Sequence, residues 1–173
     1  MQGDPRVIIN YLHVNTARCL GTYRALMVYQ DTELFQNNFW RICANSAHDS
    51  GVVQWCSLFG SNGEDNPTHW SRSGVSNISN RDEFISKVLS PIAIPFDQWQ
   101  QQHSALLEYR NKNIAHIELD DWYRAIPSFD MAIKVLFQSY IVFMNSTDHN
   151  LRNEYDRTIE RANSTISQFI RNN

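Results

Sequence analysis

The stretch Ser128–Met144, SFDMAIKVLFQSYIVFM, decides the fold of this chain. Drawn as a helix, it carries apolar side chains on nearly every face, and only Lys134, Gln138 and Ser139 interrupt its strongly apolar part. A helix that is apolar all round is buried among other helices. The stretch is also too short and too interrupted to cross a bilayer. We therefore expect it to be the central, most buried helix of an all-α protein without a membrane segment.

Outward from this stretch, apolar periodicity predicts further helices on both sides. A polar run at 45–51 interrupts the second of them, either as a kink or as a break into two helices. Residues 60–80 are rich in Gly, Asn and Ser and should be irregular, and a connector between Pro91 and Pro95 follows a short helix. We expect one domain over residues 1–173, a bundle of four to five long helices with short additional ones. We expect helices at about 5–29, 33–59, 81–89, 128–144 and 148–170, and a further one that begins near residue 96. The second of these helices carries an apolar stripe of Phe35, Phe39, Ile42, Val53, Cys56 and Phe59.

Composition narrows the class of protein further. The 173 residues include only 6 Gly and 5 Pro, which favours helices over a turn-rich β fold. Three cysteines without regular spacing argue against a disulfide framework, and no signal peptide is recognisable, so we expect a cytoplasmic protein. The net charge of −3, without a basic tail, means that any nucleic-acid binding requires a local basic patch.

The helix that begins near Phe96 carries an unusual arginine. Its apolar face includes Phe96, Trp99, His103, Leu106, Arg110 and Ile114, at steps of three or four residues. An unpaired guanidinium is costly to bury, so Arg110 requires a carboxylate, a phosphate or an open cleft. We expect His103, on the same face, to be an interior histidine with its hydrogen bonds satisfied. His116 lies six residues after Arg110, so the two act together only if the helix ends or bends near Ala115, or if another subunit supplies the partner.

The string Tyr109–His116, YRNKNIAH, with an acidic residue close behind it, resembles the signature of the HEPN superfamily. It is most similar to the HEPN proteins of bacterial abortive-infection systems. The resemblance covers roughly residues 98–143, and it places a HEPN-like core at about 96–145 of the helical bundle.

This resemblance implies a metal-independent endoribonuclease that needs no cofactor and acts as a toxin or a phage-defence effector. Arg110, Asn111 and His116 take the catalytic positions, and Lys112 is a candidate substrate-binding residue. His116 would move a proton while the RNA 2′-hydroxyl attacks, and Arg110 would stabilise the charged phosphate, leaving a 2′,3′-cyclic phosphate. The family also implies a homodimer with the motifs facing across its interface, RNA as the substrate, and a cognate antitoxin.

Alternatives remain open at this point. His116 could cap backbone carbonyls at a helix end while Arg110 pairs with a core carboxylate, in a non-catalytic HEPN-like interaction or dimerisation module. Cys43, His48, Cys56 and His69 are ligand-type residues, but their spacing matches no zinc pattern. A second pattern, Trp55–Gly60 followed by His69 and Trp70, also occurs in the sequence, and no chemistry attaches to it.

Overall fold

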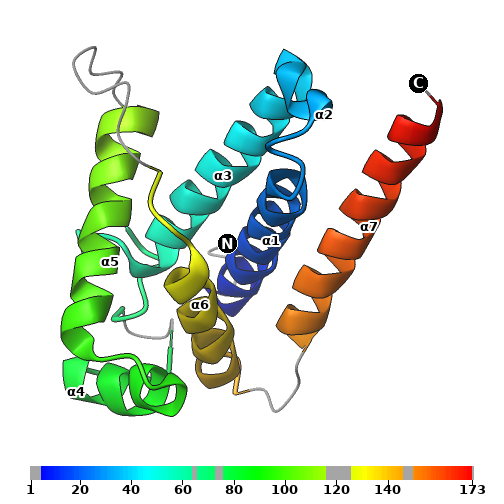
Figure 1. The fold of residues 1–173 in the computed structure, drawn as a ribbon. Helices are drawn as coiled ribbons and strands as arrows, with labels where there is room; N and C mark the ends of the chain where they lie inside the picture. The colour runs from blue at the N-terminus through cyan, green and yellow to red at the C-terminus, as the bar shows by residue number, and fades with distance from the viewer. Residues whose placement is uncertain (1–4, 64–65, 73–75, 116–125, 146–149, 173) are drawn as a thin grey trace.

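The chain forms a bundle of helices in the computed structural model, which describes residues 5–63, 66–72, 76–115, 126–145 and 150–172 (Figure 1). These residues contain no strand, which confirms the predicted all-α fold. None of the described helices is long and apolar enough to cross a membrane. The five long helices are α1 (Pro5–Met27), α3 (Asn38–Phe59), α5 (Phe96–Tyr109), α6 (Asp130–Phe143) and α7 (Asn150–Asn172).

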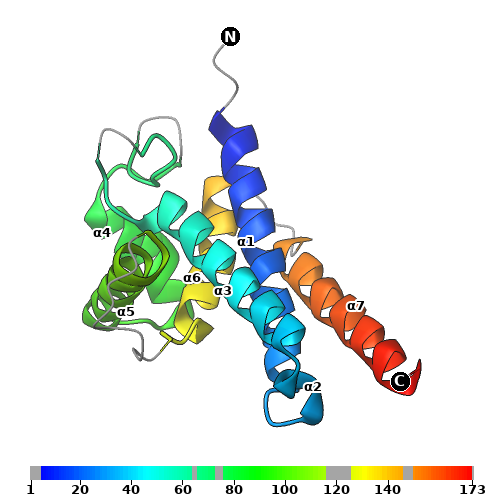
Figure 2. The same cartoon turned by 90° about the horizontal axis from the view of Figure 1, so that it is seen from above.

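Helix α1 lies between α3 and α7 in both views and packs most extensively against these two (Figures 1 and 2). Helix α5 lies on the other side of α3, and α6 contacts α1, α5 and α7. The short helices are α2 (Glu33–Gln36), α4 (Arg81–Phe84), the π-helix η1 (Ile85–Leu89), the 3₁₀-helix η2 (Ser90–Ile92) and the π-helix η3 (Arg110–Ala115).

The expectation that α6 is the most buried helix holds only in part. Leu136 and Val135 are fully buried in the main core, but Lys134 is exposed on the same helix. Helix α3 contributes an equally buried face, on which Trp55 and Phe59 are among the largest fully buried side chains. The core therefore lies between α1, α3, α5 and α6 rather than around α6 alone.

Helix α3 differs from the prediction in both its start and its buried face. The break falls at Asn37, whose side-chain oxygen caps the helix by accepting from the Phe39 amide at 2.9 Å. The polar run 45–51 lies inside one continuous helix, and Gly51 permits close approach of α1, because a Cβ there would lie 2.7 Å from Leu20 Cδ2. The predicted stripe is wrong for three residues that are exposed: Phe39 by 61%, Ile42 by 62% and Val53 by 41%.

The C-terminal end of α3 is capped by side chains and backbone from later in the chain. The last carbonyls of a helix have no partner within the helix and must find one elsewhere. Three of them are bonded here, which gives the Trp55–Gly60 and His69–Trp70 pattern a structural role. The Thr68 hydroxyl donates to Ser57 O (2.9 Å), the Trp70 amide donates to Leu58 O (3.0 Å), and His103 Nε2 donates to Phe59 O (2.5 Å).

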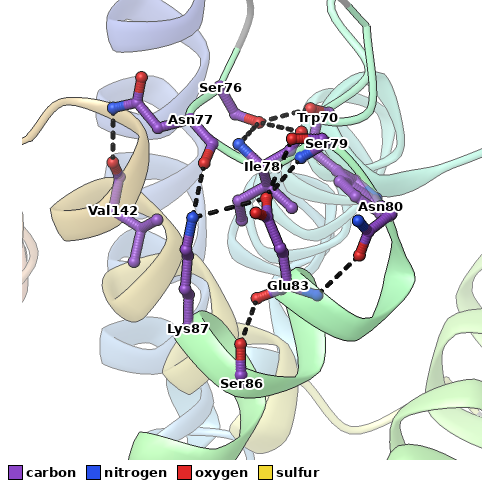
Figure 3. Close-up of polar contacts among 10 residues, drawn as sticks. All are labelled: Trp70, Ser76, Asn77, Ile78, Ser79, Asn80, Glu83, Ser86, Lys87 and Val142. Carbon is purple, nitrogen blue, oxygen red and sulfur yellow. Dashed lines mark hydrogen bonds and ion pairs between the residues drawn. The ribbon is translucent and has the colours of Figure 1, made fainter.

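The segment before α5 is anchored by a cap at the start of α4 (Figure 3). The Asn80 side chain accepts from the Glu83 amide at 3.0 Å, and the Glu83 carboxylate accepts from the Ser79 amide at 2.8 Å. This bond to the Ser79 amide lowers the pKa of Glu83. Asn77 reaches α6 by donating its side-chain amide to Val142 O at 3.5 Å, so the cap is tied to the body of the bundle.

Candidate functional site

The predicted site residues lie where the winding of a helix changes. Helix α5 ends at Tyr109, and the chain continues directly into the π-helix η3, Arg110–Ala115. Single π-helical turns are rare and occur frequently at functional sites. Asn113 supports this turn by donating its side-chain amide to Tyr109 O at 3.3 Å. Arg110, Asn111 and Lys112 are consecutive on η3, whereas His116 lies outside the described residues.

Arg110 is half-buried and is oriented by its neighbour. Its Nε and Nη2 atoms donate to Asn111 Oδ1 at 3.0 and 2.8 Å, so the amide oxygen receives a two-pronged contact from the guanidinium. In the described part of the chain, no carboxylate lies within ion-pair distance of Arg110. A guanidinium has five N–H donors, and Asn111 accounts for two of them. The core-carboxylate partner that we considered for Arg110 is therefore not found in the described residues.

The turn packs against helix α3, with Arg110 close to Cys56. Burial raises the pKa of the Cys56 thiol to about 12, and the positive charge of Arg110 opposes that rise. This thiol is thus uncharged near neutral pH and is not an activated nucleophile.

Lys112 is paired with a carboxylate at the end of α5. Its Nζ lies 3.2 Å from Glu108 Oε1, four residues earlier in the chain. Such pairs on a helix surface contribute about 0.3–0.5 kcal/mol and leave the side chains able to exchange partners. The positive charge that Lys112 brings to the site is therefore partly balanced by Glu108.

A second set of polar residues borders this turn, and the sequence pattern did not connect it with Arg110. Asp49 Oδ1 accepts a hydrogen bond from the Tyr109 hydroxyl at 2.9 Å and lies 3.1 Å from His48 Nδ1. Burial, together with the Asp49 carboxylate, raises the pKa of Tyr109. The signal that could have found this pair is the polar run 45–51 in an otherwise apolar helix.

The remaining candidate residues have structural partners. His103 is half-buried rather than interior, and its Nε2 is bonded to Phe59 O, so the expectation of a structural partner for this histidine is met at one ring nitrogen. His69 bonds to the Ser71 hydroxyl at 2.8 Å. Within the described ranges, no group of three or more Cys, His, Asp or Glu side chains is placed to hold a metal ion.

Chemically, the turn offers an oriented guanidinium, an amide and an ammonium group on three consecutive residues. Such donors bind anions, and phosphate oxygens fit a guanidinium especially well. No protein-family model matches the chain, and neither does any curated protein or any solved structure.

Proposed function

We propose that the chain is a metal-independent endoribonuclease of the HEPN type, in which Arg110, Asn111 and His116 form the active centre. The observation that carries this proposal is the placement of Arg110 and Asn111, bonded to each other at 2.8 and 3.0 Å, on a π-helical turn that leads directly into His116. We further propose that the protein is cytoplasmic, that it acts as a toxin or a phage-defence effector, and that a cognate antitoxin restrains it.

The proposed reaction needs no metal because RNA supplies its own nucleophile. His116 removes the proton from the 2′-hydroxyl, or returns one to the leaving 5′-oxygen, as an imidazole titrating near neutral pH can do. Arg110 binds the phosphate and stabilises the charge that grows on it in the transition state. Asn111 holds the guanidinium in place, and Lys112 contacts a neighbouring phosphate. The product carries a 2′,3′-cyclic phosphate.

A second copy of the chain is part of this proposal. Ile42, Asp49 and Val53 are spaced by seven and four residues, which places them on one face of α3. Asp49 on that face bonds to Tyr109, the residue before Arg110, so the exposed apolar residues flank the proposed site. Covering Ile42 and Val53 with the same face of a second copy would bring two Arg110 turns to one cleft, which also concentrates positive charge for RNA.

A non-catalytic helical interaction module is the second candidate. It is favoured by the exposed apolar residues Phe39, Ile42 and Val53, because a line of such residues on one helix suits a partner protein. In this case the bond between Arg110 and Asn111 has only a structural role.

The deciding experiment is a cleavage assay on mixed cellular RNA, with a chelator present, using the purified protein. We expect the wild type to cleave and to leave cyclic phosphate ends. Arg110→Gln should lower the rate at least about 100-fold, the usual effect of removing one transition-state donor. His116→Ala should abolish cleavage. Arg171→Gln, which removes an exposed arginine near the end of α7, is the matched control and should cleave like the wild type.

Circular dichroism should show that all variants remain helical. A folded wild type that cleaves no RNA would remove the ribonuclease proposal and leave the interaction module. Cleavage that survives Arg110→Gln at the wild-type rate would place the active centre elsewhere, and cleavage lost on chelation would replace the mechanism with a metal-dependent one.

A further inference from the structure

One carboxylate links helix α3 to the start of the Arg110–Ala115 turn. The Oδ1 atom of Asp49 accepts from the Tyr109 hydroxyl at 2.9 Å and lies 3.1 Å from His48 Nδ1. Tyr109 is the last residue of α5, so this bond is made where α-helical winding gives way to π-helical winding. The two hydrogen-bonding partners are sixty residues apart in the chain, which makes the contact a tertiary one.

His48 holds the carboxylate from the interior side. Its side chain is fully buried, and its ring makes edge-to-face contacts with Tyr23, Tyr109 and Phe129 at centroid distances of 5.0, 5.1 and 4.8 Å. These rings come from α1, α5 and the residue before α6, so they fix the imidazole between three other parts of the bundle. Since Nδ1 faces an acceptor, it carries the proton and donates to Asp49. In the described part of the structure Nε2 has no hydrogen-bond partner, so the bond to Asp49 is the polar anchor of this ring.

Asp49 is poorly suited to contacting RNA itself. Its side chain is 38% exposed, and no Lys or Arg among the described residues lies within ion-pair distance of it. An unbalanced negative charge beside a phosphate site repels the substrate. The two short contacts instead direct one carboxylate oxygen towards Tyr109 and His48, which suits a role in holding the turn.

We propose that Asp49, fixed by His48, is a positioning residue that holds the Arg110–Ala115 turn against α3 through Tyr109. The positioning itself is a property of the fold, and its effect on catalysis rests on the proposed ribonuclease function. A hydrogen bond to a carboxylate is stronger than one between two neutral groups. Loss of this bond should therefore raise the local opening of the turn by at least about tenfold.

Amide hydrogen–deuterium exchange of the full-length protein tests the positioning directly. We expect Tyr109→Phe, which keeps the ring against His48, to speed exchange at residues 110–115 by about tenfold or more, while α7 exchanges as in the wild type. Asp49→Leu should have the same effect. Asp49→Asn should leave residues 110–115 as protected from exchange as in the wild type, because the Asn amide oxygen can accept from both the Tyr109 hydroxyl and His48 Nδ1. Tyr11→Phe, at an exposed tyrosine of α1, is the matched control. Exchange at 110–115 within twofold of wild type in Tyr109→Phe would overturn the proposal.

RNA cleavage measured on the same variants separates this inference from the proposed function. If the wild type cleaves RNA, Tyr109→Phe should lower kcat more than it raises KM, because Arg110 stabilises the transition-state charge more strongly than it binds the substrate phosphate, and Asp49→Asn should retain most activity. Faster exchange with an unchanged kcat would overturn the role of Asp49 in catalysis. If the wild type cleaves no RNA, the ribonuclease proposal fails alone, and the exchange rates still decide whether Asp49 holds the turn.

Discussion

At the scale of single residues, His13 is a fully buried imidazole, and burial favours its neutral form. Its Nδ1 lies 2.9 Å from Ile9 O and donates there, and its Nε2 lies 3.1 Å from Ser139 Oγ. The rings of Phe59, Tyr140 and Phe143 surround it. Burial lowers the pKa of His13 to about 4, well below its ordinary value of 6.5.

Because the pKa of His13 is lowered in the folded protein, we expect the free energy of unfolding to decrease in mild acid. Between pH 6.5 and 4 the unfolded chain binds a proton at His13 that the folded protein does not, so the free energy of unfolding falls as the pH drops and levels off below pH 4. From His13 alone we expect a decrease of about 2 kcal/mol between pH 7.5 and pH 5. Burial also lowers the pKa of His69 to about 4, which acts in the same direction. Urea denaturation at the two pH values measures the difference.

The non-titrating variant His13→Gln separates this histidine from other groups. It should be less stable than the wild type at pH 7.5, because it loses packing. Its free energy of unfolding should fall by about 2 kcal/mol less than that of the wild type between pH 7.5 and pH 5. If the free energy of unfolding falls equally in both proteins, His13 is not the group that destabilises the fold in acid.

The sequence predicts the local part of the candidate site and misses the tertiary part. Arg110, Asn111 and Lys112 are neighbours in the chain, so their common placement on one turn follows from a helix through the motif. Asp49 comes to this turn only because α3 packs on η3, and spacing within one helix does not contain that information. The π-helical winding of this turn was not predicted either.

At the scale of elements, the end of α3 depends on donors from the loop that follows it. The Thr68 hydroxyl donates to Ser57 O at 2.9 Å, at a half-buried position. Thr68→Val keeps the shape of the side chain but removes this donor, so we expect the free energy of unfolding to fall by about 1 kcal/mol. Thr165→Val on α7 is the matched control: there the hydroxyl bonds to Arg161 O on the exposed helix surface, and the change should stay within about 0.5 kcal/mol.

Urea denaturation of both variants makes the comparison. Equal stability of Thr68→Val and Thr165→Val would mean that water replaces the Thr68 hydroxyl at this carbonyl. The same helix also shows why its buried face was not predicted. Apolar residues occur on both sides of α3, and the close approach of Leu20 to Gly51 selects the side with Trp55, which leaves Ile42 in solvent.

At the scale of the whole molecule, the exposed face of α3 predicts self-association. Ile42 is 62% exposed and shares this face with Val53, next to the Asp49–Tyr109 contact. If a second copy covers it, Ile42→Glu places a negative charge from each copy in the interface and should convert the dimer to a monomer. Light scattering after gel filtration should then give 20.2 kDa in place of twice that mass.

Val7→Glu is the control for this experiment, because Val7 is a similarly exposed apolar residue (65%) near the start of α1, away from the α3 face. It carries the same change in charge and should remain a dimer. Association and RNA cleavage should be lost together in Ile42→Glu, because the proposed active centre uses both Arg110 turns. A wild type of 20.2 kDa at concentrations where it cleaves RNA would show instead that one copy is sufficient, and the face of α3 would then be available to a different protein.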